Sequence, residues 1–94
     1  MIHALKIQPK YFDAVRSEVK TFELRKNDRD FRVGDFLALN EWDGDHYTGR
    51  TELREVRYML DVGDVIQGAD DIVLMSIAKN GSSRYDNAET EWKI

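Results

Sequence analysis

The residues with the clearest potential for chemistry lie in a charged segment, residues 20–32 (KTFELRKNDRDFR). Lys20, Glu23 and Arg25 bring an ammonium group, a carboxylate and a guanidinium close together in the chain. A guanidinium can hold a phosphate or a base edge with two parallel hydrogen bonds, and an ammonium suits phosphate as a point cation. A carboxylate can accept a hydrogen bond from the exocyclic amine of cytosine. Together these residue types indicate a site for an anionic or polar ligand.

The pattern of this segment predicts a β-strand over residues 20–26. Successive strand side chains point to opposite faces, so Phe22 and Leu24 are expected on one face. The other face is expected to carry a row of polar groups, from Thr21, Glu23 and Arg25. The alternative is that Glu23 and Arg25 form structural ion pairs with neighbouring strands, and such a pair at a surface would contribute only about 0–1 kcal/mol.

Three further residues are weaker candidates for the same site. Arg29 follows the predicted strand on a loop, and loops on rigid scaffolds often carry binding residues. Tyr47 could stack on a base, and Arg50 follows it closely in the sequence YTGR. The simpler roles are a solvated side chain for Arg29 and half-buried packing for Tyr47.

The elements that must position these residues begin with a strand over residues 3–7 and an amphipathic helix over residues 9–18. Pro9 suits the first turn of a helix, and apolar residues recur after it at helical spacing. Further strands are predicted over residues 36–42, 47–60 and 70–78, with a tight turn at 43–45 and a loop at 61–69.

One helix and five mostly antiparallel strands predict an α+β fold in which a strongly curved sheet closes into a small barrel. Gly49 is expected to mark a bulge that bends the fourth strand. The barrel domain is predicted over residues 1–80. A polar C-terminal extension is predicted over residues 81–94, with Trp92 and Ile94 near its end.

The charge distribution limits the possible partners. The chain has 94 residues, which fits one domain, and its net charge of −4 argues against a dominant nucleic-acid binder. Residues 1–34 carry eight Lys or Arg and five Asp or Glu, a net of +3, whereas residues 35–94 carry six and thirteen, a net of −7. A basic part on an acidic body can focus positive potential on one cleft.

Composition also narrows the chemistry. The absence of cysteine excludes disulfides, thiolate metal sites and cysteine nucleophiles. His3 and His46 lack metal-ligand spacing, so no metal and no cofactor is expected. The chain has no apolar run near membrane-spanning length and no signal-peptide pattern, so we expect a cytoplasmic protein without membrane contact.

Three motifs, in their order and spacing, carry a family resemblance: Lys20–Arg25 (KTFELR), Arg32–Asp35 (RVGD) and Tyr47–Arg50 (YTGR). With the sequence around them, over most of residues 1–80, they resemble small bacterial and phage domains of the DUF3850 type, related to the ASCH group of the PUA-like superfamily. The resemblance implies a PUA-like β-barrel with a cleft beside the helix and the second strand. It also implies an association with RNA binding or RNA modification.

Some ASCH proteins resemble amidohydrolases that act on N4-acetylcytidine with a lysine, a threonine three residues later and a distant glutamate. Lys20 matches the lysine, but Glu23 stands at the threonine position. Glu18 stands two residues before the lysine, where the wider group usually has glycine. These departures count against the amidohydrolase activity and leave the cleft in place.

The leading expectation is a protein that binds RNA, or a nucleoside or nucleotide, in a cleft lined by Lys20, Glu23 and Arg25, with Arg29, Tyr47 and Arg50 as further ligand-binding candidates. The second is a metal-free hydrolase on a modified nucleoside, with Lys20 as nucleophile or base activator and Glu23 in proton transfer. The third is a protein-interaction module in which the charges are ordinary surface groups and the acidic C-terminal part meets a partner.

Overall fold

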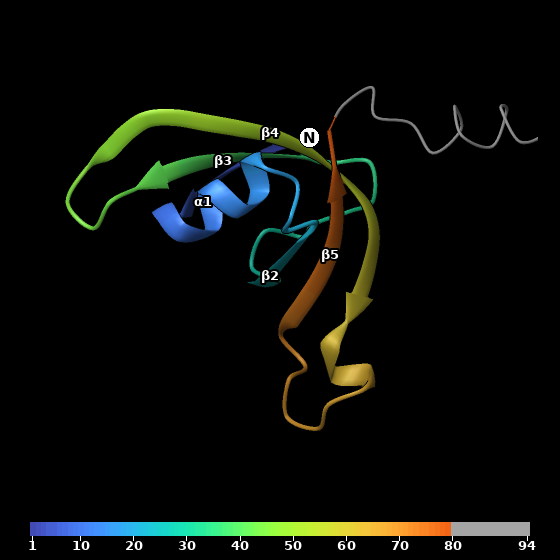
Figure 1. The fold of residues 1–94 in the computed structure, drawn as a ribbon. Coiled ribbons are helices and arrows are strands. Elements are labelled where there is room, and N and C mark those ends of the chain that lie inside the picture. The colour runs from blue at the N-terminus through green and yellow to red at the C-terminus, as the bar shows by residue number, and fades with distance from the viewer. Residues whose placement is uncertain (80–94) are drawn as a thin grey trace, which may run out of the picture.

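Five strands and one short helix make up residues 1–79, the part of the chain that the structure, a computed structural model, describes (Figure 1). In chain order they are β1 (Ile2–Ile7), α1 (Pro9–Arg16), β2 (Phe22–Lys26), β3 (Phe36–Trp42), β4 (Tyr47–Asp61) and β5 (Ile72–Ala78), with a 3-10 turn, η1 (Val62–Asp64), between the last two strands. The predicted strands and helix are confirmed, with small shifts of their ends. The predicted extension over residues 81–94 lies outside the described residues.

The five strands form one mixed sheet with the order β1-β3-β4-β5-β2. The pairs β3–β4, β4–β5 and β2–β5 are antiparallel, but β1 pairs with β3 in parallel. Parallel neighbours need a long connection between them, and here α1 and β2 provide it. The sheet curls into a half-barrel, so the expected mostly antiparallel barrel is matched only in part.

The curl of the sheet follows the long strand β4, which bends along its length in Figure 1. Its register against β3 shifts between Asn40 and Trp42, opposite the stretch of β4 that contains Gly49. Gly49 has a φ of 90°, a conformation that glycine adopts without steric cost. The predicted bulge is therefore confirmed, and a second register shift between Val56 and Tyr58 adds to the bend.

The hydrophobic core fills the inner side of the curled sheet, where α1 packs against β3 and β4. Phe12 and Val15 lie three residues apart on one helix face and are fully buried. The strands supply alternate residues to the same core, namely Leu5, Ile7, Leu37, Leu39, Val56, Val73, Met75 and Ile77. No β2 side chain belongs to this apolar cluster in the described part of the chain.

The two edge strands, β1 and β2, are joined by side chains and not by a backbone ladder within residues 1–79. The Arg25 guanidinium donates to the Lys6 carbonyl oxygen, and Arg29 Nη1 donates to the Ala4 carbonyl oxygen at 2.7 Å. Along β1, the backbone groups of alternate residues point toward β3 and away from it. Those of Ala4 and Lys6 point away from β3, so their carbonyls lie on the open edge of the sheet. The two arginines therefore satisfy edge acceptors that a closed barrel would pair with a strand.

The turn after α1 ends the helix two residues before its predicted end. Glu18 has a φ of 63°, and the Glu18 and Val19 amides donate to the Val15 and Ala14 carbonyls, both at 3.0 Å. This is the hydrogen-bond pattern of a Schellman motif, whose left-handed residue is usually glycine. The resemblance places a glycine at this same position, and the backbone geometry gives a physical reason for it.

We predict that Glu18→Gly raises the free energy of unfolding by about 1 kcal/mol, because a left-handed backbone opposes a Cβ atom. Urea unfolding followed by tryptophan fluorescence measures this change. Glu18→Ala is the matched control, since it removes the carboxylate and keeps the Cβ. An equal gain in Glu18→Ala would assign the effect to charge and contradict the account.

Candidate functional site

The strand β2 places Glu23 and Arg25 on the inner face of the sheet and Phe22 and Leu24 on the outer face. Glu23 is 4% exposed, whereas Phe22 and Leu24 are 47% and 56% exposed. Glu23 pairs with Met75 of β5, which is fully buried in the core. A sheet with one solvated face usually buries its apolar residues, so β2 reverses the common arrangement. The prediction that Glu23 and Arg25 share a face is confirmed.

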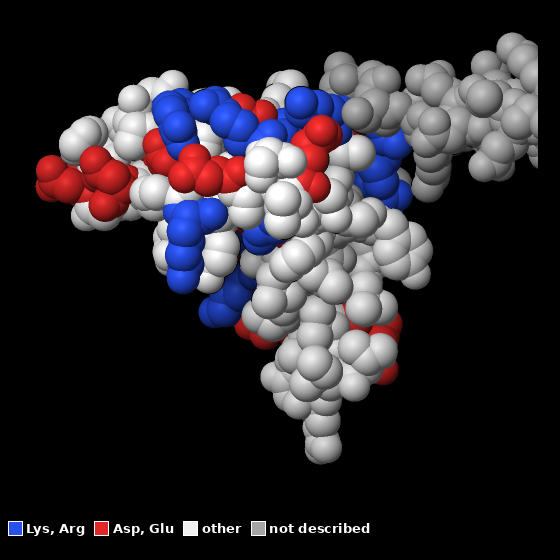
Figure 2. All heavy atoms as spheres, in the orientation of Figure 1, with Lys and Arg blue, Asp and Glu red and all other residues white. Residues whose placement is uncertain are grey.

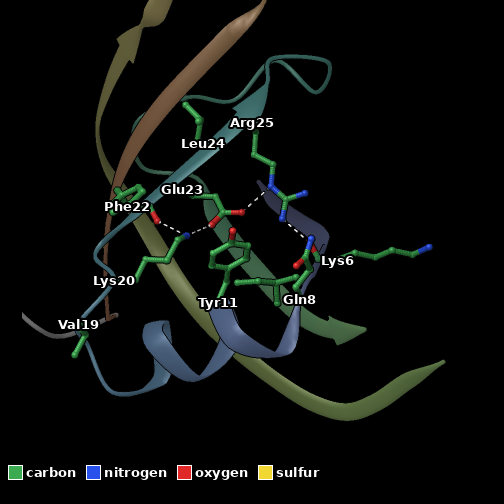
Figure 3. Close-up of a pocket in the computed structure, with 10 residues that line it drawn as sticks. Lys6, Gln8, Tyr11, Val19, Lys20, Phe22, Glu23, Leu24 and Arg25 are labelled. Atoms are coloured by element: carbon green, nitrogen blue, oxygen red, sulfur yellow. Dashed lines mark hydrogen bonds and ion pairs between the residues drawn. The ribbon is translucent and has the colours of Figure 1, made fainter. Parts of the chain in front are cut away.

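The Glu23 carboxylate lies between two cations (Figure 3). Lys20 Nζ donates to Glu23 Oε1 at 2.8 Å, and Arg25 Nε donates to Glu23 Oε2 at 2.6 Å. A buried carboxylate is stable only when it is paired and hydrogen-bonded, and here each oxygen has a charged partner. Glu23 thus forms ion pairs with residues of its own segment and not with the neighbouring strands that the structural alternative expected, and these pairs fix the positions of both cations.

A pocket of about 710 Å³ opens over this charged group, between β2, the end of β1 and the start of α1. Ligand pockets typically have volumes of roughly 300–1,000 Å³. Three Lys or Arg and one Glu line it, a net charge of +2 (3 − 1), in a chain whose net charge is −4. The lining residues are Lys6, Ile7, Gln8, Tyr11, Val19, Lys20, Phe22, Glu23, Leu24 and Arg25.

Two aromatic rings of the pocket lie near Lys20. Its Nζ atom is 5.7 Å from the centre of the Tyr11 ring and 4.9 Å from the centre of the Phe22 ring. Tyr11 comes from α1 and Phe22 from β2, so the rings approach Lys20 from different elements (Figure 3). Both residues are partly exposed and offer apolar faces to a planar ligand.

Comparison with known proteins gives the family of this chain. Residues 2–77 match the family described as "Domain of unknown function (DUF3850)". The chain belongs to this family. It is also 42% identical, over 74 residues, to the "Uncharacterized 12.9 kDa protein in GpA 3'region" of Escherichia phage P2.

The match to the phage protein covers 79% of this chain and 65% of the relative. The chain therefore matches less than two thirds of that relative's length. The DUF3850 part of the predicted resemblance is confirmed, whereas the link to the ASCH group and the PUA-like superfamily stays a prediction.

The remaining candidates of this DUF3850 domain lie outside the lining of the pocket. Arg29 belongs to the contacts that hold β1, where it donates to the Ala4 carbonyl. Tyr47 packs edge-on against Trp42, with 4.8 Å between ring centres. Tyr47 and Arg50 instead line a smaller hollow of about 140 Å³ on the β3–β4 hairpin. A binding role for these three residues stays a prediction. They do not line the pocket that contains Lys20 and Glu23.

The Arg50 side chain is held by a second buried carboxylate. Its Nε atom donates to Glu41 Oε1 at 2.9 Å, and Thr48 Oγ1 donates to the same oxygen at 2.6 Å. The hydroxyl of Thr48 is the main cause that lowers the pKa of Glu41, and the guanidinium of Arg50 adds to it against the opposing effect of burial. The pKa of Arg50 is raised by its contacts with Asp13 and Glu41.

Sequence reasoning missed Tyr11 as a pocket residue. The helix buries Phe12 and Val15, which turns Tyr11 toward the pocket with 41% of its surface exposed. Tyr11 is four residues before Val15 but adjacent to Phe12, so a helical wheel centred on Phe12 and Val15 would have placed it at the edge of the buried stripe.

Within residues 1–79, no group of three or more His, Asp or Glu side chains could hold a metal ion. In the same part of the chain, no helix has the length and apolar character needed to cross a membrane.

We predict that Glu41 makes the stability of the domain sensitive to acid. Its pKa in the folded state lies below the ordinary value of 4.5, so its stabilising effect is complete above that value. The effect is lost as the pH falls through the lower, folded-state pKa. Glu41→Gln should therefore be less stable than wild type at neutral pH, and the difference should shrink below about pH 4.5.

Urea unfolding at a series of pH values measures this difference. Asp28→Asn is the control, because Asp28 is exposed and should leave the pH dependence unchanged. A difference between Glu41→Gln and wild type that stays constant from pH 7 into the acid range would contradict the assignment.

Proposed function

We propose that this domain binds a nucleotide-sized ligand, free or as part of RNA, in the pocket between β1, α1 and β2. The observation that carries the proposal is the Lys20–Glu23–Arg25 group, which holds two cations in fixed positions at the floor of a ligand-sized pocket. Fixed donors bind without loss of side-chain freedom, which favours affinity. The predicted relation to PUA-like and ASCH domains supports the same function.

Hydrogen-bonding capacity remains on both cations. Lys20 uses two of three N–H donors, on Glu23 and on the Phe22 carbonyl oxygen at 2.7 Å. Arg25 uses two of five, on Glu23 and on the Lys6 carbonyl oxygen. One donor of Lys20 (3 − 2) and three of Arg25 (5 − 2) are thus free of partners within residues 1–79 and can bind a ligand oxygen.

The aromatic rings give the pocket a second type of contact. Stacking of a base on an aromatic ring contributes about 1–3 kcal/mol and depends little on the identity of the base. Tyr11 and Phe22 lie close to the Lys20 ammonium. If the base of a nucleotide stacks on either ring, a carbonyl oxygen of the base or the phosphate of the nucleotide would lie near a donor. The pocket therefore offers the two contacts that a nucleotide requires.

The surface charge favours a small ligand over a long strand. Lys or Arg and Asp or Glu groups are interleaved over the side of the molecule formed by α1, β3 and β4, and acidic groups gather at the tip of the β3–β4 hairpin (Figure 2). Long nucleic acids are usually bound along a continuous basic surface. On this face no such surface extends across the described residues.

A hydrolase is the second candidate, favoured by the direct contact of Lys20 with Glu23 at 2.8 Å. In this pair, Lys20 would be the nucleophile or base activator and Glu23 the proton acceptor. Glu23 accepts a hydrogen bond from a cation at each oxygen, however, and it stands where the amidohydrolase motif has threonine. Binding without turnover is the function that this arrangement supports better.

We predict that nucleoside monophosphates shift the NMR signals of β2 and of the start of α1, and that Lys20→Met weakens binding about tenfold or more. The loss of one charge-assisted hydrogen bond accounts for this magnitude. Lys26→Ala is the control, because Lys26 ends the strand that follows Lys20, has a 70% exposed side chain and does not line the pocket.

An equal loss in Lys26→Ala and Lys20→Met would contradict the proposed site. So would signal shifts confined to the β3–β4 hairpin. In parallel, chromatography after incubation with N4-acetylcytidine should show the nucleoside unchanged. Deacetylation by wild type and not by Lys20→Met would make the hydrolase the better account.

A further inference from the structure

We infer that the pocket recognises a terminal phosphate group, so that its ligand is a nucleoside monophosphate or the phosphorylated end of an RNA. The inference rests on the proposed function and makes it narrower. It assigns Lys20 and Arg25 to the phosphate and makes Glu23 the residue that positions them. It departs from the expectation that Glu23 reads an exocyclic amine of the base.

The position of Glu23 argues against direct reading of a base. Glu23 is 4% exposed, and each of its carboxylate oxygens accepts a hydrogen bond from a cation. Burial of Glu23 behind these two cations leaves an amine of the ligand little access to its oxygens. Lys20 and Arg25 themselves carry only N–H donors, which require an acceptor such as a phosphate oxygen.

The spacing of the cations suits one phosphate group. Lys20 Nζ and Arg25 Nε each contact one oxygen of the same carboxylate, that of Glu23. The two donor atoms are therefore held on either side of one small group. A guanidinium fork and an ammonium at such a spacing can bind different oxygens of the same phosphate. A terminal phosphate offers three such oxygens and more charge than a phosphodiester within a strand.

Phosphate needs a net positive environment, and the pocket provides one. Lys20 and Arg25 together with Glu23 keep a net charge of +1 (2 − 1) where the pocket opens. Lys6 also lines the pocket, but its ammonium lies 4.1 Å from the centre of the Trp42 ring and points away from the other lining residues in Figure 3. The nearer positive charge is therefore that of Lys20 and Arg25.

The phosphate source is either a free mononucleotide or an RNA end, and the shared chemistry is a phosphate next to a stacking base. The test uses the full chain and isothermal titration with the four nucleoside 5′-monophosphates and their matching nucleosides. Each monophosphate should bind about tenfold or more tightly than its nucleoside. Lys20→Met should bring the two affinities close together, and Lys26→Ala should leave the ratio unchanged.

A tetranucleotide with and without a 5′-phosphate forms the second arm of the same test. A preference for the phosphorylated form, at an affinity above that of the monophosphates, would assign the pocket to RNA ends. Equal affinity of nucleosides and monophosphates would overturn the phosphate inference and leave the proposed nucleotide site intact. If neither binds, the proposed function fails together with the inference.

Discussion

The pairing of the Glu23 carboxylate with two cations is the interaction on which the site depends. A carboxylate on the inner face of a sheet, beside the fully buried Met75, is costly unless charged donors surround it. Lys20 and Arg25 meet that need at 2.8 Å and 2.6 Å. The left-handed turn at Glu18 redirects the chain between α1 and β2, so the backbone there also serves this pairing.

The same group lies at the open side of the half-barrel. Arg25 belongs both to the pocket and to the contacts that hold β1, because it donates to Glu23 and to the Lys6 carbonyl. Side-chain hydrogen bonds thus replace the ladder that would close the barrel between β1 and β2. The pocket lies where that ladder is missing, so the opening that leaves two strand edges unpaired also gives a ligand access to fixed donors.

Much of the fold could be predicted from the sequence because it depends on local patterns. Periodicity located the helix and the strands, and Gly49 marked the bulge in β4. The parallel pairing of β1 with β3 depends on contacts far apart in the chain, which alternation does not reveal. The shared face of Glu23 and Arg25 was predictable, but that this face is the buried one was not, since solvation normally favours the reverse. Arg50 has a carboxylate partner on the neighbouring strand, and that tertiary contact keeps it from the pocket.

The central claim, that Glu23 holds Arg25 in place, is tested most directly by a double-mutant cycle on the free energy of urea unfolding. The cycle compares Glu23→Ala, Arg25→Ala and the double variant with wild type. The account predicts a coupling energy of about 1–3 kcal/mol, because either single change leaves a charged partner in a partly buried position. Additive effects, with a coupling energy near zero, would show that the two side chains act independently and would contradict the account.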